Sequence, residues 1–120
     1  MHELSIAAAI IDKLQELARA QRATRIVELE LHCGVMQQIV PESLQMAFEA
    51  VSVDTPAAGA TLKIVAEAVV ARCRTCGRQF QAEIDDYLCT HCQAADVEIL
   101  AGRDVTLRSV VCELEEGVTP

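Results

Sequence analysis

The sequence predicts an α+β fold in which two helices pack on a small mixed three-stranded sheet, with an inserted zinc-ribbon-like module. Two observations carry this prediction. The spacing of apolar residues alternates along the chain between the period of a helix and the period of a strand. Between the second and third predicted strands, a stretch with two Cys-x-x-Cys pairs breaks the pattern. We expect an α+β domain of residues 1–70 plus 104–116 and a cysteine module of residues 71–103.

The first predicted helix covers residues 4–22, and the first strand covers Arg25–Cys33. In the helix, apolar side chains line one face: Ile10, Ile11, Leu14, Leu17 and Ala18. In the strand the period changes to two. The apolar side consists of Val27, Leu29, Leu31 and Cys33, and the polar side consists of Glu28, Glu30 and His32. This alternation is typical of a strand that is buried on one face.

A second helix is expected after Gly34, and two further strands complete the sheet. Pro41 suits the first turn of a helix, and helical spacing continues to a turn at residues 54–56. The apolar residues of this helix are Val40, Leu44, Ala47, Phe48 and Val51. A strand over 62–70 has apolar residues on both sides, which indicates a central place in the sheet. The last strand is expected over 105–114, with Leu107 and Val111 on one side.

Composition excludes several classes of partner. The 120 residues carry a formal charge of -8, which argues against nucleic acid or an anionic membrane as partner. The three aromatic residues are too few for a surface that stacks single-stranded bases. The longest apolar run, Ile6–Ile11, is far shorter than the ~20 residues of a membrane helix. Because His2 and Glu3 are unlike the start of a secretory signal, we expect a cytosolic protein with reduced cysteines.

Four of the six cysteines form two matched pairs, Cys73 with Cys76 and Cys89 with Cys92. Two residues between thiols let one tight turn present both sulfur atoms to the same ion. Two such turns complete a tetrahedral set of soft ligands, which selects Zn(II). Since a catalytic zinc ion keeps an open position, four thiolates predict a structural ion. A glycine, Gly77, follows the first pair, where a positive φ is often needed, whereas glutamine follows the second.

The remaining cysteines and two of the histidines are expected to have ordinary surroundings. Cys33 and Cys112 lie on predicted strands, where a thiol behaves as a small buried hydrophobic group. His32 is expected at the surface, and His91 is expected to be a solvated loop residue rather than a supplementary metal ligand. Whether either histidine approaches a second metal ion in the fold stays open.

The chain begins with Met1-His2-Glu3, a sequence that has no special role in most proteins. Its chemistry nevertheless allows a metal site, because the α-amine, the next backbone nitrogens and the His2 imidazole can chelate one ion. A tetragonal set of nitrogen atoms suits Ni(II) or Cu(II) better than Zn(II). The amine and imidazole must be neutral, and their reference pKa values are about 7.8 and about 6.5. Binding should therefore weaken on mild acidification.

Several motifs occur in a characteristic order. They are Met1-His2-Glu3, a helix, a strand ending at Gly34, Val40-Pro41-Glu42-Ser43-Leu44 with Phe48-Glu49 beyond it, Gly59-Ala60-Thr61-Leu62, the two Cys-x-x-Cys pairs and a terminal strand. This combination resembles the HypA/HybF family of hydrogenase-maturation nickel metallochaperones over nearly the full length. The chain departs from the family at Cys89-Thr90-His91-Cys92-Gln93, where the family often has Cys-Pro-x-Cys-Gly.

The resemblance implies a metal carrier and not an enzyme. Its Ni(II) site would be built around His2 with the backbone nitrogens of His2 and Glu3 and the terminal Met1, and Zn(II) would be held by Cys73, Cys76, Cys89 and Cys92. The implied partners are a nickel-handling maturation GTPase and the large-subunit precursor of [NiFe]-hydrogenase. Some members of the family also serve urease.

Two other classes of function compete with the nickel carrier. A zinc-ribbon adaptor would bind protein partners and hold one metal ion per chain, with no contribution from the amino terminus. An oxidoreductase would need a reactive thiolate in a Cys-x-x-Cys pair after zinc has been accounted for. The first alternative differs from the nickel carrier only at Met1-His2-Glu3.

Overall fold

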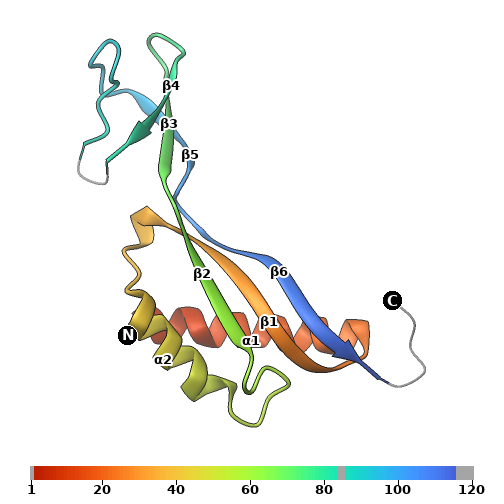
Figure 1. The fold of residues 1–120 in the computed structure, drawn as a ribbon. Coiled ribbons are helices and arrows are strands. Elements are labelled where there is room, and N and C mark those ends of the chain that lie inside the picture. The colour runs from red at the N-terminus through yellow and green to blue at the C-terminus, as the bar shows by residue number, and fades with distance from the viewer. Residues whose placement is uncertain (1, 84–85, 116–120) are drawn as a thin grey trace. The chain divides into compact units, whose positions relative to one another are not determined.

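The computed structural model describes residues 2–83 and 86–115, which form two compact units (Figure 1). The first, which we call the helical unit, consists of the described parts of Met1–Leu31, Ile39–Ile64 and Leu107–Pro120. The second, which we call the cysteine unit, consists of the described parts of His32–Gln38 and Val65–Thr106. The assignment of nickel to residues 1–70 plus 104–116 stays a prediction, and so does the assignment of zinc to residues 71–103.

The larger sheet has three strands in the order β2-β1-β6, and two helices accompany it. Its strands are β1 (Ala23–Gly34), β2 (Thr61–Glu67) and β6 (Val105–Leu114), and the helices are α1 (His2–Gln21) and α2 (Pro41–Ser52). In Figure 1, β1 and β2 run in the same direction while β6 runs opposite to them, so the sheet is mixed. The predicted α+β class with two helices and a mixed three-stranded sheet is confirmed.

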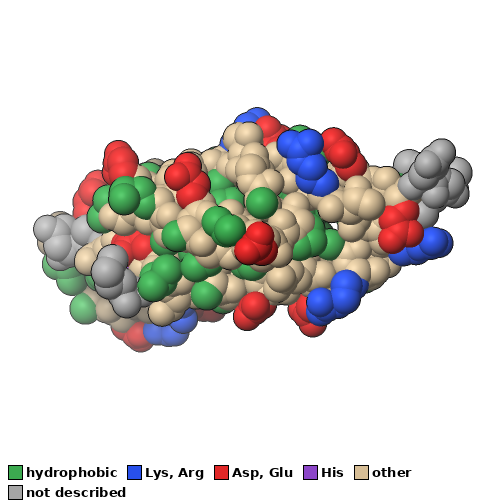
Figure 2. All heavy atoms as spheres, turned by 90° about the horizontal axis from the view of Figure 1, so that it is seen from below, with side chains coloured by type: hydrophobic (Ala, Val, Ile, Leu, Met, Phe, Trp, Pro, Cys, Tyr) green, Lys and Arg blue, Asp and Glu red, His purple; other side chains and the backbone are tan. Residues whose placement is uncertain are grey.

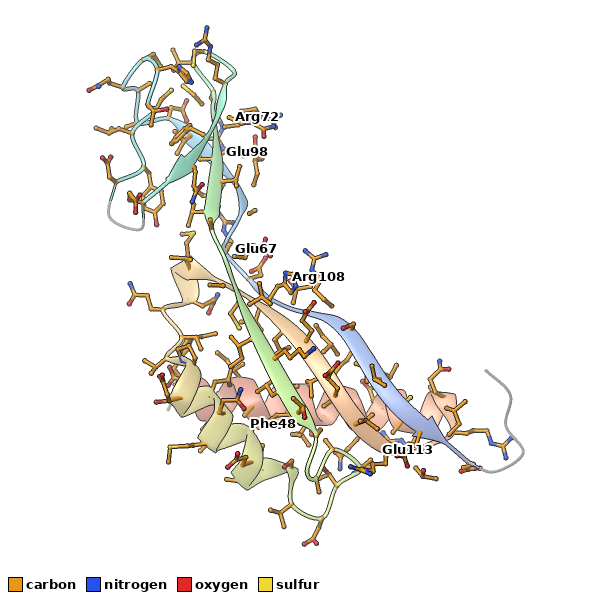
Figure 3. The ribbon with its side chains drawn as sticks, viewed as in Figure 1. Phe48, Glu67, Arg72, Glu98, Arg108 and Glu113 are labelled. Atoms are coloured by element: carbon orange, nitrogen blue, oxygen red, sulfur yellow. The ribbon has the colours of Figure 1, made fainter. Side chains whose placement is uncertain are left out.

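The core of the helical unit is made mainly of small aliphatic side chains. Its buried members include Ala7, Ile10, Ile11, Leu14, Ala18, Ile26, Leu29, Leu31, Leu44, Phe48 and Leu62. Phe48 extends from α2 and is 2% exposed (Figure 3). Helix α2 ends at Ser52, whose carbonyl oxygen accepts a hydrogen bond from the Thr55 hydroxyl at 2.6 Å. Val40 caps the start of α2 and is 49% exposed, so it does not belong to the buried face as its spacing suggested.

Three expectations about the strands were wrong in detail. The predicted second strand divides at Ala68 into β2 and β3 (Val69–Cys73), which belong to different sheets. The central strand of the larger sheet is β1, and β2 lies at the edge. The second apolar face, which suggested a central place, belongs partly to β3, where Val69 is buried in the other core. On β1 Ile26 is fully buried, as Leu29 and Leu31 are, but Val27 is not, and on β6 Val111 is 52% exposed.

The cysteine unit contains a second sheet with the order β4-β3-β5, formed by β3, β4 (Gln79–Ala82) and β5 (Val97–Ala101). β4 and β5 both pair antiparallel with β3, so that Ala71 lies opposite Phe80 on one side and Ile99 on the other. An ion pair of 3.0 Å joins Arg72 to Glu98 across this sheet (Figure 3). The core consists of Val69, Ala71, Cys73, Phe80, Ala82 and Cys89, with Met36 packed against it.

The short segment after β1 is bound to the turn between β5 and β6. The backbone N–H of Gly34 donates to the Asp104 carbonyl at 2.9 Å, and that of Met36 donates to the Gly102 carbonyl at 3.0 Å. A Cβ atom on Gly34 would lie 2.3 Å from the Gly102 carbonyl oxygen, so only glycine allows this approach. These contacts attach the 3-10 helix η1 (Val35–Gln37) to the cysteine unit.

Candidate metal sites

The four paired cysteines converge on one point of the cysteine unit. One sulfur atom from each of Cys73, Cys76, Cys89 and Cys92 lies within 4.8 Å of all the others. The sulfur atoms of Cys73 and Cys92 are 3.5 Å apart, and those of Cys76 and Cys89 are 3.7 Å apart. Zinc–thiolate bonds of about 2.3 Å in a tetrahedron separate sulfur atoms by about 3.8 Å. Both the donor type and the spacing therefore fit a zinc ion.

The two Cys-x-x-Cys turns have the same backbone conformation. In the first, the Gly77 N–H donates to the Cys73 carbonyl at 2.8 Å, and in the second the Gln93 N–H donates to the Cys89 carbonyl at 2.9 Å. The φ angles of Gly77 and Gln93 are 78° and 64°, so both residues are left-handed. The glutamine thus replaces the expected glycine without a change in the turn, although a side chain with positive φ costs about 1 kcal/mol.

Local contacts lower the pKa of two of the thiols, Cys73 and Cys89, and raise that of a third, Cys92. The Cys76 N–H donates to the Cys73 sulfur at 3.4 Å and lowers the pKa of Cys73 to about 6. A hydrogen bond from the Cys92 N–H lowers the pKa of Cys89 in the same way. A hydrogen bond from the Ala94 N–H also lowers the pKa of Cys92. The neighbouring thiols, led by Cys73, outweigh it and raise the pKa of Cys92 to about 11. A bound cation favours the ionised form of every thiol in such a cluster.

His91 lies beside the cluster without joining it. Its Nδ1 atom is 3.0 Å from an Arg78 guanidinium nitrogen, which is a permanent donor, so this ring nitrogen accepts a hydrogen bond. Both side chains are exposed. Within the described residues the metal-type cluster contains the four cysteines and no histidine, in agreement with the expectation that His91 is a solvated loop residue.

The amino-terminal residues that can bind a metal lie in the first turn of α1. The His2 side chain is 48% exposed, and its Nδ1 atom is 3.6 Å from the Glu3 carboxylate. Met1 lies outside the described residues. The first four N–H groups of an α-helix have no carbonyl partner inside the helix, so the amides of His2 and Glu3 are not tied into the helical hydrogen-bond pattern. An imidazole and two such nitrogen atoms follow one another at this end of the chain.

Glu3 also connects α1 to α2. Its carboxylate accepts a hydrogen bond of 3.3 Å from the backbone N–H of Val40, the residue that caps α2. The Glu3 backbone amide first, and then the Val40 amide, lower the pKa of the Glu3 carboxyl. Sequence reasoning missed Val40 as a partner of Glu3. Every residue except proline has a backbone N–H, so the residue type at position 40 does not indicate this hydrogen bond.

The other cysteines and His32 stay outside both clusters. Cys33 is 5% exposed, and burial raises the pKa of its thiol, as expected for a small hydrophobic side chain. Cys112 is half-buried. The Nδ1 atom of His32 lies 3.8 Å from the Glu67 carboxylate within the cysteine unit, and the His32 side chain is 26% exposed.

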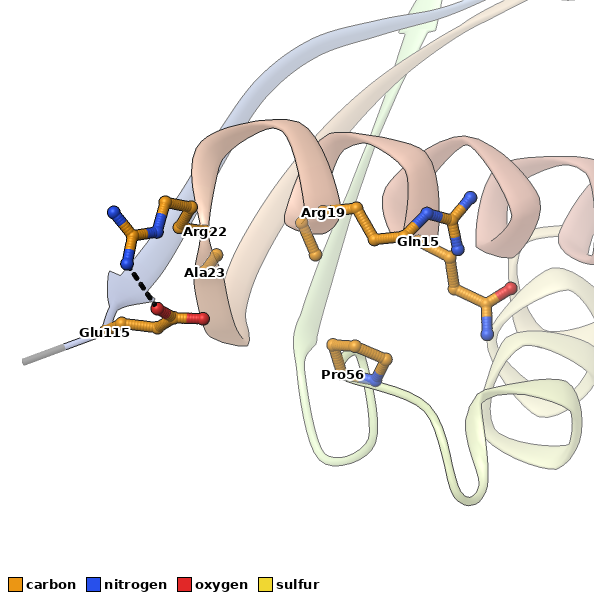
Figure 4. Close-up of a pocket in the computed structure, with 7 residues that line it drawn as sticks. Gln15, Arg19, Arg22, Ala23, Pro56 and Glu115 are labelled. Atoms are coloured by element: carbon orange, nitrogen blue, oxygen red, sulfur yellow. Dashed lines mark hydrogen bonds and ion pairs between the residues drawn. The ribbon is translucent and has the colours of Figure 1, made fainter. Parts of the chain in front are cut away.

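A pocket of about 350 Å³ lies at the opposite end of α1 from His2 (Figure 4). It is lined by Gln15, Ala18, Arg19, Arg22, Ala23, Pro56 and Glu115. Two of these residues, Arg22 and Glu115, form an exposed ion pair of 3.2 Å. Gln15 lies thirteen positions after His2 on the helix, which at 1.5 Å per residue is about 20 Å, so this pocket is distinct from the terminal site.

A small α+β fold, a cluster of four thiols and an imidazole at the helical amino terminus together define a metal-handling protein. None of the described helices is long and apolar enough to cross a membrane. Comparison with known proteins gives the family. Residues 1–112 match the family model "Hydrogenase/urease nickel incorporation, metallochaperone, hypA", and the chain belongs to this HypA family of nickel metallochaperones in hydrogenase maturation. Such proteins are maturation factors and not enzymes.

Individual relatives agree over almost the full chain. The chain is 38% identical to the hydrogenase maturation factor HypA of Chlorobium limicola, with 98% of this chain and 99% of the relative covered. It is 31% identical to HypA of Shewanella halifaxensis, with 98% and 100% covered. The solution structure of the nickel metallochaperone HypA from Helicobacter pylori is similar at a TM-score of 0.73 and 27% identity, with 96% of this chain and 100% of that chain covered.

Proposed function

We propose that the chain binds Ni(II) at its amino terminus as cargo for the maturation of [NiFe]-hydrogenase. The ligands in this proposal are the His2 imidazole, the backbone nitrogens of His2 and Glu3, and the α-amine of Met1. The observation that carries the proposal is the position of His2, a 48% exposed imidazole in the first turn of α1, in a chain of the nickel metallochaperone family. An ion at this position would be open to solvent and to a partner protein.

The second metal in this proposal is a structural Zn(II) held by Cys73, Cys76, Cys89 and Cys92. Their donor type and sulfur separations of 3.5 and 3.7 Å support it. Cys73 and Cys89 are also members of the buried core of the cysteine unit. A metal ion bound to them would thus stabilise a unit whose own apolar core is small.

Delivery of the nickel ion requires partners. We propose that the chain acts in the cytoplasm with a nickel-handling maturation GTPase and passes the ion to the large-subunit precursor of [NiFe]-hydrogenase, and that urease can be a further recipient. The nickel function belongs to residues 1–70 plus 104–116, and the zinc function to residues 71–103. The family name, which includes both hydrogenase and urease, supports these two recipients.

A nickel titration of the zinc-loaded protein with its native amino terminus, near pH 7.5, tests the terminal site. We expect one nickel ion per chain, lost in His2→Ala and in a chain extended before Met1. The two other histidines give matched controls, because His32→Ala and His91→Ala should bind nickel as the wild type does. Wild-type affinity in His2→Ala would contradict the proposal, and the zinc-ribbon adaptor would then explain the chain better.

Metal analysis tests the zinc site separately. The purified chain should contain one zinc ion, and this ion should be retained in His2→Ala. Cys76→Ser should lose most of the zinc, whereas Cys112→Ser should keep it. Equal zinc content in the two cysteine variants would contradict the assignment.

A further inference from the structure

The four cysteines of the cluster differ in their access to solvent. In each Cys-x-x-Cys turn the first cysteine is buried, since Cys73 and Cys89 are 0% and 1% exposed. The second cysteine of each turn, Cys76 or Cys92, is exposed. Oxidation of a thiolate requires both its ionised form and access to the oxidant. A small oxidant that approaches the cluster therefore meets Cys76 and Cys92 first.

Backbone hydrogen bonds distinguish Cys76 from the other three cysteines. Each of the other sulfur atoms accepts a hydrogen bond from a backbone N–H. The acceptors are Cys73, Cys89 and Cys92, and the donors are Cys76, His91 and Ala94, in that order. The Cys76 sulfur accepts no such bond from the residues that the structure describes. Because an N–H donor stabilises the ionised sulfur and lowers its nucleophilicity, Cys76 combines exposure with the most nucleophilic sulfur of the cluster.

The surroundings of Cys76 contain several basic residues, although the chain as a whole is acidic. Figure 2 shows acidic side chains spread over one face of the molecule, and the formal charge of the chain is -8. Three arginines nevertheless lie between positions 72 and 78: Arg72, Arg74 and Arg78. The first two form ion pairs with carboxylates, whereas Arg78 contacts His91 and has no ion pair with a described residue. Reactive cysteines typically lie in exposed, electropositive surroundings of this kind.

A second sulfur atom lies beside Cys76 and comes from the other turn. The Cys76 and Cys89 sulfur atoms are 3.7 Å apart, and those of Cys73 and Cys92 are 3.5 Å apart. Each exposed sulfur is thus next to a buried sulfur of the other turn. At these separations a sulfenic acid on one sulfur can react with the other after a small movement of the side chains.

We propose that Cys76 is a modification site for a peroxide and that its oxidation releases the zinc ion as a disulfide forms with Cys89. This inference rests on the proposed function, because it describes the regulation of the zinc site. With hydrogen peroxide, the Cys76 thiolate attacks one oxygen atom, the O–O bond breaks, and hydroxide leaves. The sulfur is oxidised to a sulfenic acid and the peroxide is reduced. The Cys89 thiolate then attacks this sulfur, the S–O bond breaks, and a second hydroxide leaves.

The disulfide removes two of the four thiolate ligands. The two that remain, Cys73 and Cys92, cannot complete a tetrahedral set, so the ion is released. A second peroxide molecule would join them by the same two steps. Disulfides between the turns would then replace the ion as the connection between them, and a thiol reductant would restore the four thiols. The terminal nickel ligands take no part in these steps.

Treatment of the full-length, zinc-loaded chain with hydrogen peroxide tests the proposal. A zinc indicator follows the release of the ion, and dimedone traps the sulfenic acid. We expect zinc release, dimedone on Cys76, and recovery of bound zinc after a thiol reductant and zinc are added. The test uses the wild-type cluster, because Cys76→Ser removes a proposed ligand and loses zinc without any oxidant.

Mass spectrometry of tryptic peptides locates the disulfide. Trypsin separates the cysteines of the first turn from each other and from those of the second by cleavage after Arg72, Arg74, Arg78 and Arg103. A disulfide between the turns from Cys76 joins peptide 75–78 to peptide 79–103, and fragmentation should place it at Cys89. A disulfide within the first turn would join peptide 73–74 to peptide 75–78.

Three variants outside the cluster serve as controls. Cys33→Ala, Cys112→Ser and His2→Ala should release zinc at the wild-type rate, because none of these residues is a proposed zinc ligand. The proposal is overturned if a control cysteine variant resists the peroxide or if dimedone is found mainly on another cysteine. It is also overturned if the first disulfide forms within one turn.

The zinc content before treatment separates this proposal from the zinc assignment. A chain that holds one zinc ion and keeps it under peroxide contradicts this proposal alone. A purified chain that binds no zinc contradicts the zinc site and overturns this proposal with it.

Discussion

Gly34 gives the sharpest test of how the cysteine unit is held together. Its φ and ψ angles are -59° and 136°, which any residue adopts, so its backbone gives no reason for glycine. The reason is space. A Cβ atom would lie 2.3 Å from the oxygen and 2.4 Å from the carbon of the Gly102 carbonyl, and 2.8 Å from the Arg103 nitrogen. All three atoms are backbone atoms, so a methyl group here has to displace the chain.

The size of the effect of Gly34→Ala follows from three contributions. Reduced freedom of the unfolded chain favours alanine by ~0.4–1 kcal/mol. Overpacking costs ~1–3 kcal/mol. The displacement also weakens the hydrogen bonds from Gly34 to Asp104 and from Met36 to Gly102, each worth ~0.5–1.5 kcal/mol. The steric and hydrogen-bond costs dominate, so we expect the free energy of unfolding to fall by about 2–4 kcal/mol.

The assay combines urea unfolding of the zinc-loaded chain with hydrogen exchange of the Met36 amide, which should exchange faster in Gly34→Ala. Gly59→Ala is the matched control. Gly59 has a φ of 78° with no atom within 4 Å of its Cβ position, so alanine there costs only the backbone strain of ~1 kcal/mol. If Gly34→Ala is as stable as the wild type, or less harmful than Gly59→Ala, the reasoning from close contact fails.

Three further outcomes test other features. Gln93→Gly should raise the free energy of unfolding by ~0.5–1 kcal/mol because φ is 64°, whereas Gln81→Gly on β4 should lower it, as thermal unfolding would report. Burial raises the pKa of Cys33, so above about pH 8.5 the unfolded chain loses a proton that the folded chain retains. Stability should then fall as pH rises, and less steeply in Cys33→Ala in urea titrations. Zinc removal by a chelator should make the amides of β3, β4 and β5 exchange faster with solvent, while those of α1 stay protected. The reason is that Cys73 and Cys89 belong to the core of the cysteine unit and not to that of the helical unit.

The elements with long regular patterns could be predicted from the sequence. Helix α1 was expected over 4–22 and covers His2–Gln21, and the last strand was expected over 105–114 and covers Val105–Leu114. The convergence of the four cysteines was equally predictable, because the geometry of a Cys-x-x-Cys turn is local and a shared ion needs only two such turns. Local rules were sufficient for these features.

Features that depend on distant segments could not be predicted. Nothing near Ala68 indicates that one apolar run divides between two sheets, because the division reflects which strands pair with each half. β4 did leave a signal, since the buried residues Phe80 and Ala82 alternate with the exposed residues Gln79 and Gln81, but four residues are too few to outweigh the neighbouring cysteine turns. The hydrogen bond from Val40 to Glu3 joins residues 37 positions apart through a backbone donor.

Nickel at His2 and a partner that docks at the first turn of α1 would be linked thermodynamically. In this turn Glu3 is hydrogen-bonded to Val40, and Leu4 lines a shallow groove with residues of α2. If docking moves this turn and lowers nickel affinity by a given factor, bound nickel must lower partner affinity by the same factor. A carrier built in this way would release its cargo on docking and then bind its partner more tightly when empty. The four-thiol cluster, two of whose cysteines are buried, is not part of this groove and suits an ion that stays.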